Sequence, residues 1–336
     1  MTIQSVRGGI MTGGFTDHHV HLQLVDASAL ATSRLARVID LGADPAGIRT
    51  LAARLAGAPA PSLSQIKNAS PEADSDALSI RTDGERIKSA PETDAGGADL
   101  IRADGASADG AGADSAGAHV VRVAYAGPFL TAPGGYPSDR AWAPEGSWRE
   151  VADAADAADA VPPLVDAGVS VLKVASNSAA GPVPNDEVLR AFARLADAHD
   201  IPLVVHAEGG GQAERARRLG AHVLAHAPFS ERLADVEIAA QAASVRWIST
   251  LAIHDPEARG IAIDNVRRFH AAGGTVLYGT DMGNGPGPVD LREDELSALR
   301  EAGLDDTALL RALAPTGPPL LFLPNGDPAR AVPLVS

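Results

Sequence analysis

The sequence predicts an α/β protein built around one (β/α)8 TIM barrel, on the basis of its length, its alternating patterns and its strand composition. Its 336 residues exceed the roughly 250 that such a barrel needs. Eight β–α alternations favour a parallel barrel over an open sheet. Most runs are rich in Val, Ile and Leu without alternation, as is typical of strands buried on both faces. The eight runs are Phe15–His21, Arg37–Leu41, Val120–Tyr125, Val169–Ala175, Pro202–His206, His222–His226, Val245–Thr250 and Thr275–Thr280.

Helical patterns fill most of the intervals, with Glu187–His199 and Gln212–Leu219 the clearest, but one segment interrupts them. Residues 57–118 are dominated by Ala, Asp, Gly and Ser, as in Asp104–Ala118, and show no sustained period. Such a composition cannot bury enough apolar surface to offset the entropy lost on ordering. We therefore expect a long, disordered low-complexity insertion between the second and third strands.

The barrel itself is expected to comprise residues 15–56 and 119–314. The short N-terminal segment, residues 1–14, is interpreted as the remnant of a small subdomain. The C-terminal segment, residues 315–336, is expected to contribute one apolar strand and a turn to the same remnant. The predicted fold is thus a barrel with a truncated or vestigial β-sandwich.

Composition narrows the classes of function. The net charge is −15 and no basic patch stands out, so nucleic acid is not an expected partner. The acidic balance disfavours anionic membranes, and no apolar run approaches the about 20 residues that span a bilayer. Because Met1–Met11 lacks a signal-peptide pattern, we expect a cytoplasmic protein with a small-molecule substrate, and leave a homo-oligomer open.

The chain has no cysteine, so any bound metal must use His, Asp, Glu or a modified Lys. The strongest local pattern is Asp17–His21 (DHHVH), at the end of the first predicted strand. Since residues i and i+2 of a strand share a face, His19 and His21 point the same way and His18 points the other way. Two imidazoles on one face at a strand end make half a metal site, and packing as core histidines is the alternative.

Lys173 lies inside the apolar run Val169–Ala175, in a sequence whose other lysines are Lys67 and Lys88. A buried ammonium is costly without a partner, and burial lowers the pKa of a lysine. The neutral amine can react with carbon dioxide to give a carbamate, an anionic ligand able to bridge two cations. The alternative is a lysine that reaches solvent from the strand end or pairs with a carboxylate.

Three more polar residues stand at predicted strand ends. His206 and His226 close the fifth and sixth runs, and Asp281 follows the eighth. Together with the two histidines of the first strand and Lys173 of the fourth, they place six candidate ligands at the C-terminal ends of the strands. Barrels of this type carry their active sites at that face.

These six positions resemble the binuclear metal pattern of the amidohydrolase superfamily: HxH on strand 1, Lys on strand 4, His on strands 5 and 6, and Asp on strand 8. The chain is most similar to the imidazolonepropionase-like and prolidase-like branch, over roughly residues 12–56 and 119–285. The segments that carry the similarity are Phe15–Leu22 (FTDHHVHL), Arg37–Gly42 (RVIDLG), Ala126–Gly135 (AGPFLTAPGG) and Leu277–Gly283 (LYGTDMG).

The resemblance implies a metal-dependent amidohydrolase that cleaves the C–N bond of an amide, dipeptide or cyclic amide. It implies two divalent ions, zinc before manganese or iron, and carbamylation of Lys173 by carbon dioxide. Asp281 would take a proton from the attacking hydroxide and pass it to the leaving group. The implied ligands are His19, His21 and Asp281 for one ion and His206 and His226 for the other, with Lys173 and the hydroxide as bridges.

The sequence also departs from the branch. Both chain ends are short where the branch usually carries a β-sandwich, and strand 5 reads His206-Ala207-Glu208 in place of His-x-His. Glu208 keeps a mononuclear deaminase open, because such an enzyme uses a Glu near the strand-5 His, although it has no need of Lys173. A lactonase or other esterase, and a binding barrel without catalysis, are the further alternatives.

Weaker expectations concern the substrate. Loops after the third and fourth strands are expected to bring side chains over the metals, where they would bind a substrate carboxylate or carbonyl group. Ordinary loop packing is the competing interpretation for each of them. The candidate substrate-binding residues are Tyr136, Arg140, Asn177, Glu208, His254 and Tyr278.

Overall fold

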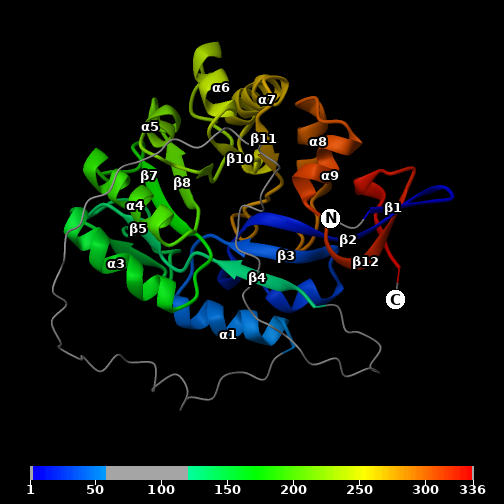
Figure 1. Ribbon diagram of the computed structural model, residues 1–336, viewed down its shortest axis with the longest axis horizontal. Helices are drawn as coiled ribbons and strands as arrows, with labels where there is room; N and C mark the ends of the chain where they lie inside the picture. The colour runs from blue at the N-terminus through cyan, green and yellow to red at the C-terminus, as the bar shows by residue number, and fades with distance from the viewer. Residues whose placement is uncertain (1–2, 58–119, 335–336) are drawn as a thin grey trace, which may run out of the picture.

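The computed structural model describes residues 3–57 and 120–334, which form a mixed α/β protein with two sheets (Figure 1). Within these residues the larger sheet has seven strands in the order β11-β10-β9-β8-β7-β5-β6, and all its pairings are parallel. The expected insertion, apart from Gly57, lies outside the described residues. No helix in the described ranges is long and apolar enough to cross a membrane.

From β7 to β11 strand and helix alternate in the larger sheet, as the sequence predicts, whereas β5 and β6 follow each other without a helix between them. Its strands are β5 (Phe129–Thr131), β6 (Trp148–Glu150), β7 (Leu172–Asn177), β8 (Leu203–Glu208), β9 (Val223–Leu224), β10 (Arg246–Ile248) and β11 (Thr275–Leu277). Its helices are α3 (Ala154–Asp166), α4 (Asp186–Ala198), α5 (Gln212–Arg218), α6 (Asp235–Ala242) and α7 (Pro256–Ala271). The last four helices connect β7 to β11 in turn, which is the pattern of parallel βαβ units.

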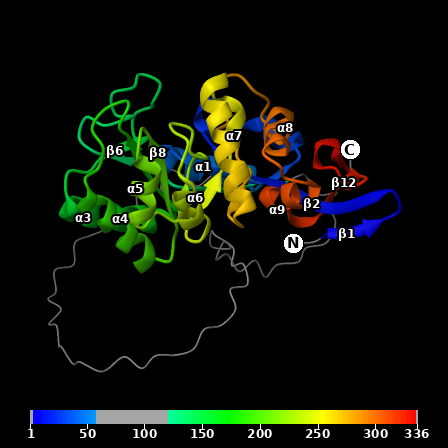
Figure 2. The same cartoon turned by 90° about the horizontal axis from the view of Figure 1, so that it is seen from above.

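The second sheet combines parallel and antiparallel strands in the order β13-β12-β2-β3-β4, with β1 paired to β2. Its strands are β1 (Ile3–Val6), β2 (Gly9–Val20), β3 (Leu35–Asp40), β4 (Arg122–Tyr125), β12 (Thr316–Pro324) and β13 (Val332–Pro333). The two ends of the chain pair antiparallel with the start of β2 and lie together at one side of the molecule (Figures 1 and 2). The expected boundary between residues 14 and 15 therefore falls inside β2, which belongs to both parts.

The remaining helices pack around the second sheet and between the two. The α-helices are α1 (Pro45–Leu55), α8 (Glu293–Glu301) and α9 (Asp306–Leu313). The short 3-10 helices are Leu22–Leu24, Ala27–Thr32, Leu251–Ile253 and Pro328–Arg330. Helix starts follow local chemistry: the carboxylate of Asp44 accepts a hydrogen bond from the Gly47 amide and caps α1, and Asn185 caps α4 in the same way.

Backbone hydrogen bonds connect the two sheets at both sides. The amide of Ser170, just before β7, donates to the carbonyl of Tyr125 in β4 at 2.9 Å. At the other side the amide of His21 donates to the carbonyl of Met282 at 2.7 Å, and Val20 forms a parallel bridge with Met282. The segment before β7 thus joins β4, and the segment after β11 joins β2. The closure of the two sheets into one barrel stays a prediction.

Two apolar clusters fill the interior. The larger cluster lies between the helices and the sheets, and in it Trp247 stacks on Phe269 with ring centroids 3.8 Å apart. The indole N–H of Trp247 donates to the side chain of Gln241, so its one polar atom is satisfied. The smaller cluster takes side chains from strands of both sheets, among them Ile39 of β3 and Val204 of β8.

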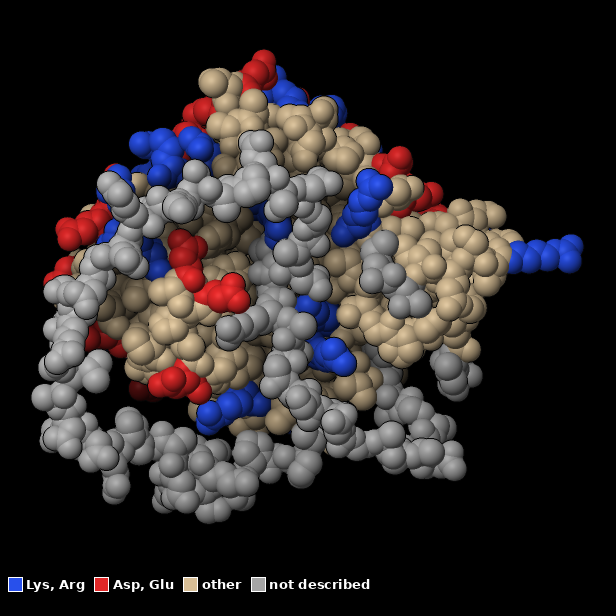
Figure 3. Space-filling view, in the orientation of Figure 1, with Lys and Arg blue, Asp and Glu red and all other residues tan. Residues whose placement is uncertain are grey.

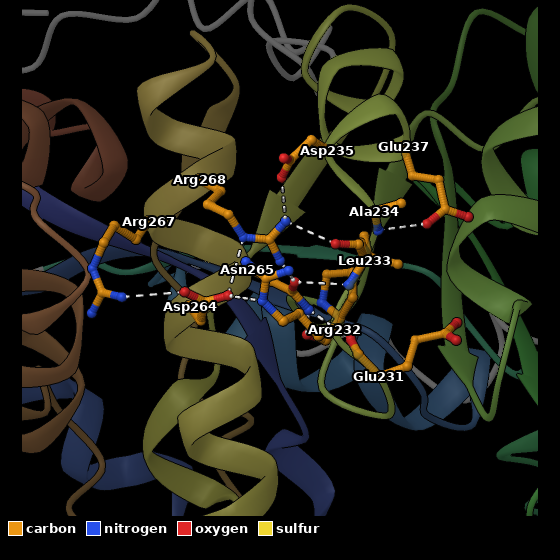
Figure 4. Close-up of polar contacts among 11 residues, drawn as sticks. Glu231, Arg232, Leu233, Ala234, Asp235, Glu237, Asp264, Asn265, Arg267 and Arg268 are labelled. Atoms are coloured by element: carbon orange, nitrogen blue, oxygen red, sulfur yellow. Dashed lines mark hydrogen bonds and ion pairs between the residues drawn. The ribbon is translucent and has the colours of Figure 1, made fainter.

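A polar network on α7 holds the segment that follows β9 (Figure 4). The buried amide of Asn265 donates to the carbonyl of Pro228 at 2.9 Å and accepts from the amide of Leu233 at 3.1 Å. Arg268, one turn further along α7, donates to the Leu233 carbonyl and to Asp235. These bonds fix the chain immediately after His226, and so limit how far that histidine can move.

Charged side chains are mixed on the surface. On the face seen in Figure 3, basic and acidic residues alternate in small groups, and neither sign forms a continuous patch. Several pairs join the two signs directly, for example Arg300 with Asp306 at 2.9 Å. The visible part of this face therefore shows no basic patch, in keeping with the overall net charge of −15.

Candidate metal centre

The paired histidines lie where β2 ends, and both are buried. Their Nε2 atoms are 3.3 Å apart, whereas His18 turns the other way, with Nδ1 2.9 Å from the Tyr278 carbonyl. Nδ1 of His19 lies 2.8 Å from the carbonyl oxygen of Ala225. Because a carbonyl only accepts, this nitrogen carries the proton, and Nε2 of His19 is free to bind a cation.

Asp281 lies directly against the two imidazoles. Its Oδ1 is 3.1 Å from Nε2 of His19 and 3.1 Å from Nε2 of His21, yet it forms no hydrogen bond with a described residue. Oδ2 accepts from the side-chain amide of Asn284 at 2.9 Å. The backbone of Asp281 has φ of +52°, a left-handed conformation that is strained for a residue with a side chain. This strained residue therefore holds an unsatisfied carboxylate oxygen between two imidazoles.

His226 and His206 continue the row of imidazoles. The ring centroids of His19 and His226 are 4.7 Å apart, and those of His226 and His206 are 4.8 Å apart. Nδ1 of His226 contacts the hydroxyl of Thr250 at 2.8 Å, and Nε2 of His206 contacts Oε2 of Glu208 at 2.9 Å. Each contact leaves the opposite ring nitrogen available. Burial lowers the pKa of His19 and His226 well below the usual value, which keeps both rings in the neutral, metal-binding form.

Lys173 in β7 is 1% exposed, and its Nζ has no hydrogen-bond partner among the described residues. Nζ lies 5.6 Å from the centroid of the Phe129 ring. Burial lowers the pKa of Lys173 to about 7, against the opposing effect of the carboxylates of Asp281 and Asp40. An ammonium ion without a partner is unfavourable in such surroundings, so a ligand or a covalent change at Nζ would stabilise the site.

The donor atoms fit a divalent ion. Ligand atoms of His19, His226 and Asp281 all lie within 4.8 Å of one another. Zinc ligands at about 2.0–2.2 Å in a tetrahedron are separated by roughly 3.3–3.6 Å. The 3.1 Å between Nε2 of His19 and Oδ1 of Asp281 is close to that value. Imidazole nitrogens with carboxylate oxygens suit zinc, and also iron or manganese.

These side chains share one cavity. Its volume is about 630 Å³, the size of a small-molecule site, and all six predicted metal ligands line it. Aromatic rings form much of the remaining wall, namely Phe129, Tyr136, Trp142 and Phe229. A row of buried polar ligands below an apolar wall is the arrangement expected of a cavity that orients a substrate over a reacting centre.

Three of the predicted substrate-binding residues lie in the cavity wall. The ring of Tyr136 stacks on that of His206 with centroids 5.5 Å apart, and His254 stacks on Phe229 at 4.1 Å. Glu208 is the third, and the hydrogen bond from His206 holds the pKa of its carboxyl below the usual value. Burial raises the pKa of Tyr136 and lowers that of His254 to about 4, so both are neutral near pH 7.

The other three predicted substrate-binding residues do not line the cavity. Tyr278 is fully buried, and its hydroxyl accepts a hydrogen bond from the amide of Arg292, so it packs in the core instead of contacting substrate. The guanidinium of Arg140 lies over the Tyr136 ring, 5.8 Å from its centroid, and pairs with Asp139. Asn177 donates to Glu208 at 2.6 Å and so acts on the cavity through that carboxylate.

Sequence reasoning missed three residues near the centre. Phe129 belongs to β5, in a segment interpreted as the loop after strand 3, and its ring lies against both Lys173 and His21. Asn284 holds Asp281 from a loop without a recognisable pattern. Asp40 is buried at the end of β3, and only its position at a predicted strand end could have indicated it.

Comparison with known proteins identifies the fold. No family model and no curated protein matches the sequence, but many solved structures match the three-dimensional arrangement. One is a Xaa-Pro dipeptidase with bound methionine in its active site, at a TM-score of 0.57 and 14% identity, covering 90% of this chain and 73% of the other. Another is the ochratoxinase of A. niger, at a TM-score of 0.59 and 12% identity, covering 96% and 76%.

A putative prolidase from Bifidobacterium longum is similar to the same degree, at a TM-score of 0.57 and 16% identity, covering 90% of this chain and 67% of the other. The chain therefore has the fold of these prolidase and amidohydrolase structures. The resemblance predicted from the sequence is thereby confirmed at the level of the fold. At these identities the comparison establishes the fold alone, and the site of this chain has to be interpreted from its own residues.

Proposed function

We propose that this protein is a metal-dependent hydrolase that cleaves the C–N bond of an amide, dipeptide or cyclic amide. The observation that carries the proposal is the cluster of His19, His226 and Asp281, with ligand atoms within 4.8 Å of one another, in one cavity with the unpartnered Nζ of Lys173. The structural neighbours, which include a putative prolidase, an ochratoxinase and a molinate hydrolase, support a hydrolase.

The proposal includes two divalent ions, zinc in the first instance. Nζ of Lys173 would add to the carbon of carbon dioxide, forming an N–C bond and releasing one proton, and the carbamate would contribute two anionic oxygens. This step gives the buried nitrogen the polar partners that it lacks. The proposed ligands are His19, His21 and Asp281 for one ion and His206 and His226 for the other, with carbamylated Lys173 between them.

The chain's own groups carry the proton transfers. These ligands would hold a divalent ion, which when bound would polarise a scissile carbonyl group and lower the pKa of water to about 7. Oδ1 of Asp281 then accepts the proton of the attacking water and passes it to the leaving nitrogen. Asn284, bonded to Oδ2, keeps the carboxylate oriented during both transfers. The rings of Phe129 and Trp142 line the same cavity and give the reacting centre apolar walls.

We further propose that the two sheets close into one eight-stranded barrel. The hydrogen bonds from Ser170 to Tyr125 and from His21 to Met282 support the closure at its two joints. The smaller apolar cluster supports it too, because it draws side chains from strands of both sheets, as the filled interior of a barrel would. A closed barrel would place the strand ends in a ring around the cavity.

A deaminase is the second candidate, and one observation favours it. Oε2 of Glu208 lies 2.9 Å from Nε2 of His206, beside the cavity, where a carboxylate could transfer protons to a leaving amine. This chemistry would need a single ion and no carbamate. The unpartnered Nζ of Lys173 instead favours an enzyme that hydrolyses the C–N bond of an amide.

The two candidates separate in an activity panel. Protein stripped with a chelator and reloaded with zinc, manganese or iron would be offered amides, dipeptides, lactams, lactones and amino-substituted heterocycles. We expect amide or lactam hydrolysis that requires metal and falls by roughly 10²–10⁴-fold in Asp281→Asn. The exposed Asp294→Asn serves as the matched control. Ammonia release from heterocycles alone would support the deaminase, and inactivity on the whole panel would contradict both.

A further inference from the structure

One carboxylate in the cavity wall is left unused by the proposed hydrolysis. Glu208 ends β8, and its side chain is 28% exposed. Both of its hydrogen bonds fall on Oε2, which accepts from Nε2 of His206 at 2.9 Å and from the side-chain amide of Asn177 at 2.6 Å. Within the described residues Oε1 accepts none. The carboxylate is thus held rigidly by one oxygen while the other remains available to a ligand.

Among the described residues, the cavity wall offers no guanidinium and no exposed ammonium group to pair with a substrate carboxylate. No arginine of the described residues lines it, and Lys173, its one lysine, is 1% exposed. Arg140, the nearest candidate from the sequence, lies against the Tyr136 ring and pairs with Asp139 at 3.3 Å. A substrate carboxylate beside Glu208 would therefore meet a like charge and no bidentate partner.

One aromatic ring, that of Tyr136, lies near this carboxylate. Tyr136 stacks on His206, the same ring that Glu208 holds, and the centroids of Tyr136 and Trp142 are 6.0 Å apart. Cations are attracted to aromatic faces within about 6 Å of the ring centroid, and most strongly to Trp and Tyr. The Arg140 guanidinium already lies over the Tyr136 ring, 5.8 Å from its centroid, so the group left to recognise an ammonium ion is the fixed carboxylate of Glu208.

We propose that the substrate carries a cationic nitrogen, a primary ammonium group, which Oε1 of Glu208 binds. The inference rests on the proposed hydrolase function and narrows its substrate class. Amides with an ammonium group close to the scissile bond are preferred, and amides with a free carboxylate at that place are excluded by Glu208. Glu208 is a specificity-determining residue in this account.

Three short hydroxamates of similar shape test this preference. 3-Aminopropanohydroxamate, butanohydroxamate and succinohydroxamate share one metal-binding group and differ only in an ammonium, a methyl or a carboxylate end. Their dissociation constants would be measured by calorimetry at pH 7.5 with zinc-loaded wild type, Glu208→Gln and Glu231→Gln. Glu231 is the control, because it carries the same charge, accepts a hydrogen bond from the Gly211 amide and does not line the cavity.

Wild type and Glu231→Gln should bind the ammonium compound about tenfold more tightly than the methyl compound. In Glu208→Gln this ratio should fall to near one, with zinc content unchanged. The ratio compares two ligands on one protein, so a general weakening of the metal site does not alter it. Three outcomes would overturn this inference and leave the proposed function standing. They are equal binding of the ammonium and methyl compounds to wild type, a preference for the ammonium compound that survives in Glu208→Gln, and tightest binding of succinohydroxamate. If none of the three hydroxamates binds, that result contradicts the metal site and the proposed function as well as this inference.

Discussion

The hydroxyl of Thr280 donates a 2.5 Å hydrogen bond to Oδ2 of Asp17, although 263 residues separate the two in sequence. Oδ1 of the same carboxylate accepts from the amide of Thr280 at 3.1 Å and from the amide of His19 at 3.0 Å. One buried carboxylate therefore joins the end of β2 to the residue that precedes Asp281. Two of the proposed metal ligands are fixed relative to each other through Asp17.

Removing this joint should weaken metal binding. Thr280→Val keeps the volume of the side chain but leaves the buried Oδ2 of Asp17 without its hydroxyl donor, at a cost of about 1–3 kcal/mol. Because the loss of a group that orients a metal ligand commonly lowers metal affinity about 10- to 100-fold, we expect zinc affinity to fall by about that factor. Competition with a chromogenic chelator measures it. Thr50→Val, which removes a hydroxyl bonded within α1, is the control, and equal zinc affinity in both variants would contradict the role of Asp17.

A glycine beside His19 gives a second test. A Cβ at Gly279 would lie 2.2 Å from Cγ2 of Ile248 and 3.2 Å from Cβ of His19, so Gly279→Ala must displace one of them. We expect a loss of about 1–3 kcal/mol in the free energy of unfolding, together with weaker zinc binding. Gly260→Ala in α7 is the matched control, because a Cβ there meets nothing within 4 Å.

For Gly260→Ala we expect the free energy of unfolding to rise by about 0.5–1 kcal/mol, because alanine favours the helix more than glycine does, and zinc affinity to stay unchanged. Urea unfolding and chelator competition supply the two readouts. If Gly279→Ala binds zinc as wild type does, the close packing of strand ends around His19 is not what positions the ligand.

Stability should depend on the protonation of Glu295. Burial raises the pKa of this carboxyl from 4.5 to about 7, although its Oε2 accepts a 2.7 Å bond from the amide of Ala252. Because the folded pKa is above the unfolded one, the folded state binds more protons between pH 4.5 and about 7. The contribution of Glu295 to the free energy of unfolding is therefore complete below pH 4.5. It declines as pH rises to about 7, by on the order of 3 kcal/mol.

Urea unfolding at pH 5 and pH 8 tests this dependence. Glu295→Gln keeps the shape and the acceptor but cannot ionise, so it should lose less stability than wild type between the two pH values. The exposed Glu293→Gln on the same helix should behave as wild type does. An equal decline in Glu295→Gln and wild type would show that another group carries the pH dependence.

The candidate ligands could be predicted from sequence because each depends on local rules. The two-residue period of a strand places His19 and His21 on one face, and the carboxyl ends of parallel strands share one edge, which brings Lys173 and His206 together. The alternation of strands with helices was enough to predict the order β7 to β11. None of these inferences needed the path of a loop.

The substrate side of the cavity could not be predicted in this way. The segment read as a loop after the third strand forms β5 and β6, and so brings Phe129 to the cavity, which no strand period indicated. Tyr278 stands three residues before Asp281, but its side chain packs into the core and bonds to Arg292. Loop paths and the direction of a side chain at an irregular strand end depend on tertiary packing.

The central claim is that Lys173 joins two ions in one site, and metal content per chain tests it most directly. Lys173→Met keeps an unbranched apolar side chain of similar length, with sulfur in place of Cδ, and removes the amine. We expect close to two zinc ions per chain in wild type reloaded in the presence of bicarbonate, and one or none in Lys173→Met with the fold intact by circular dichroism. One ion per chain in both proteins would contradict the bridged centre.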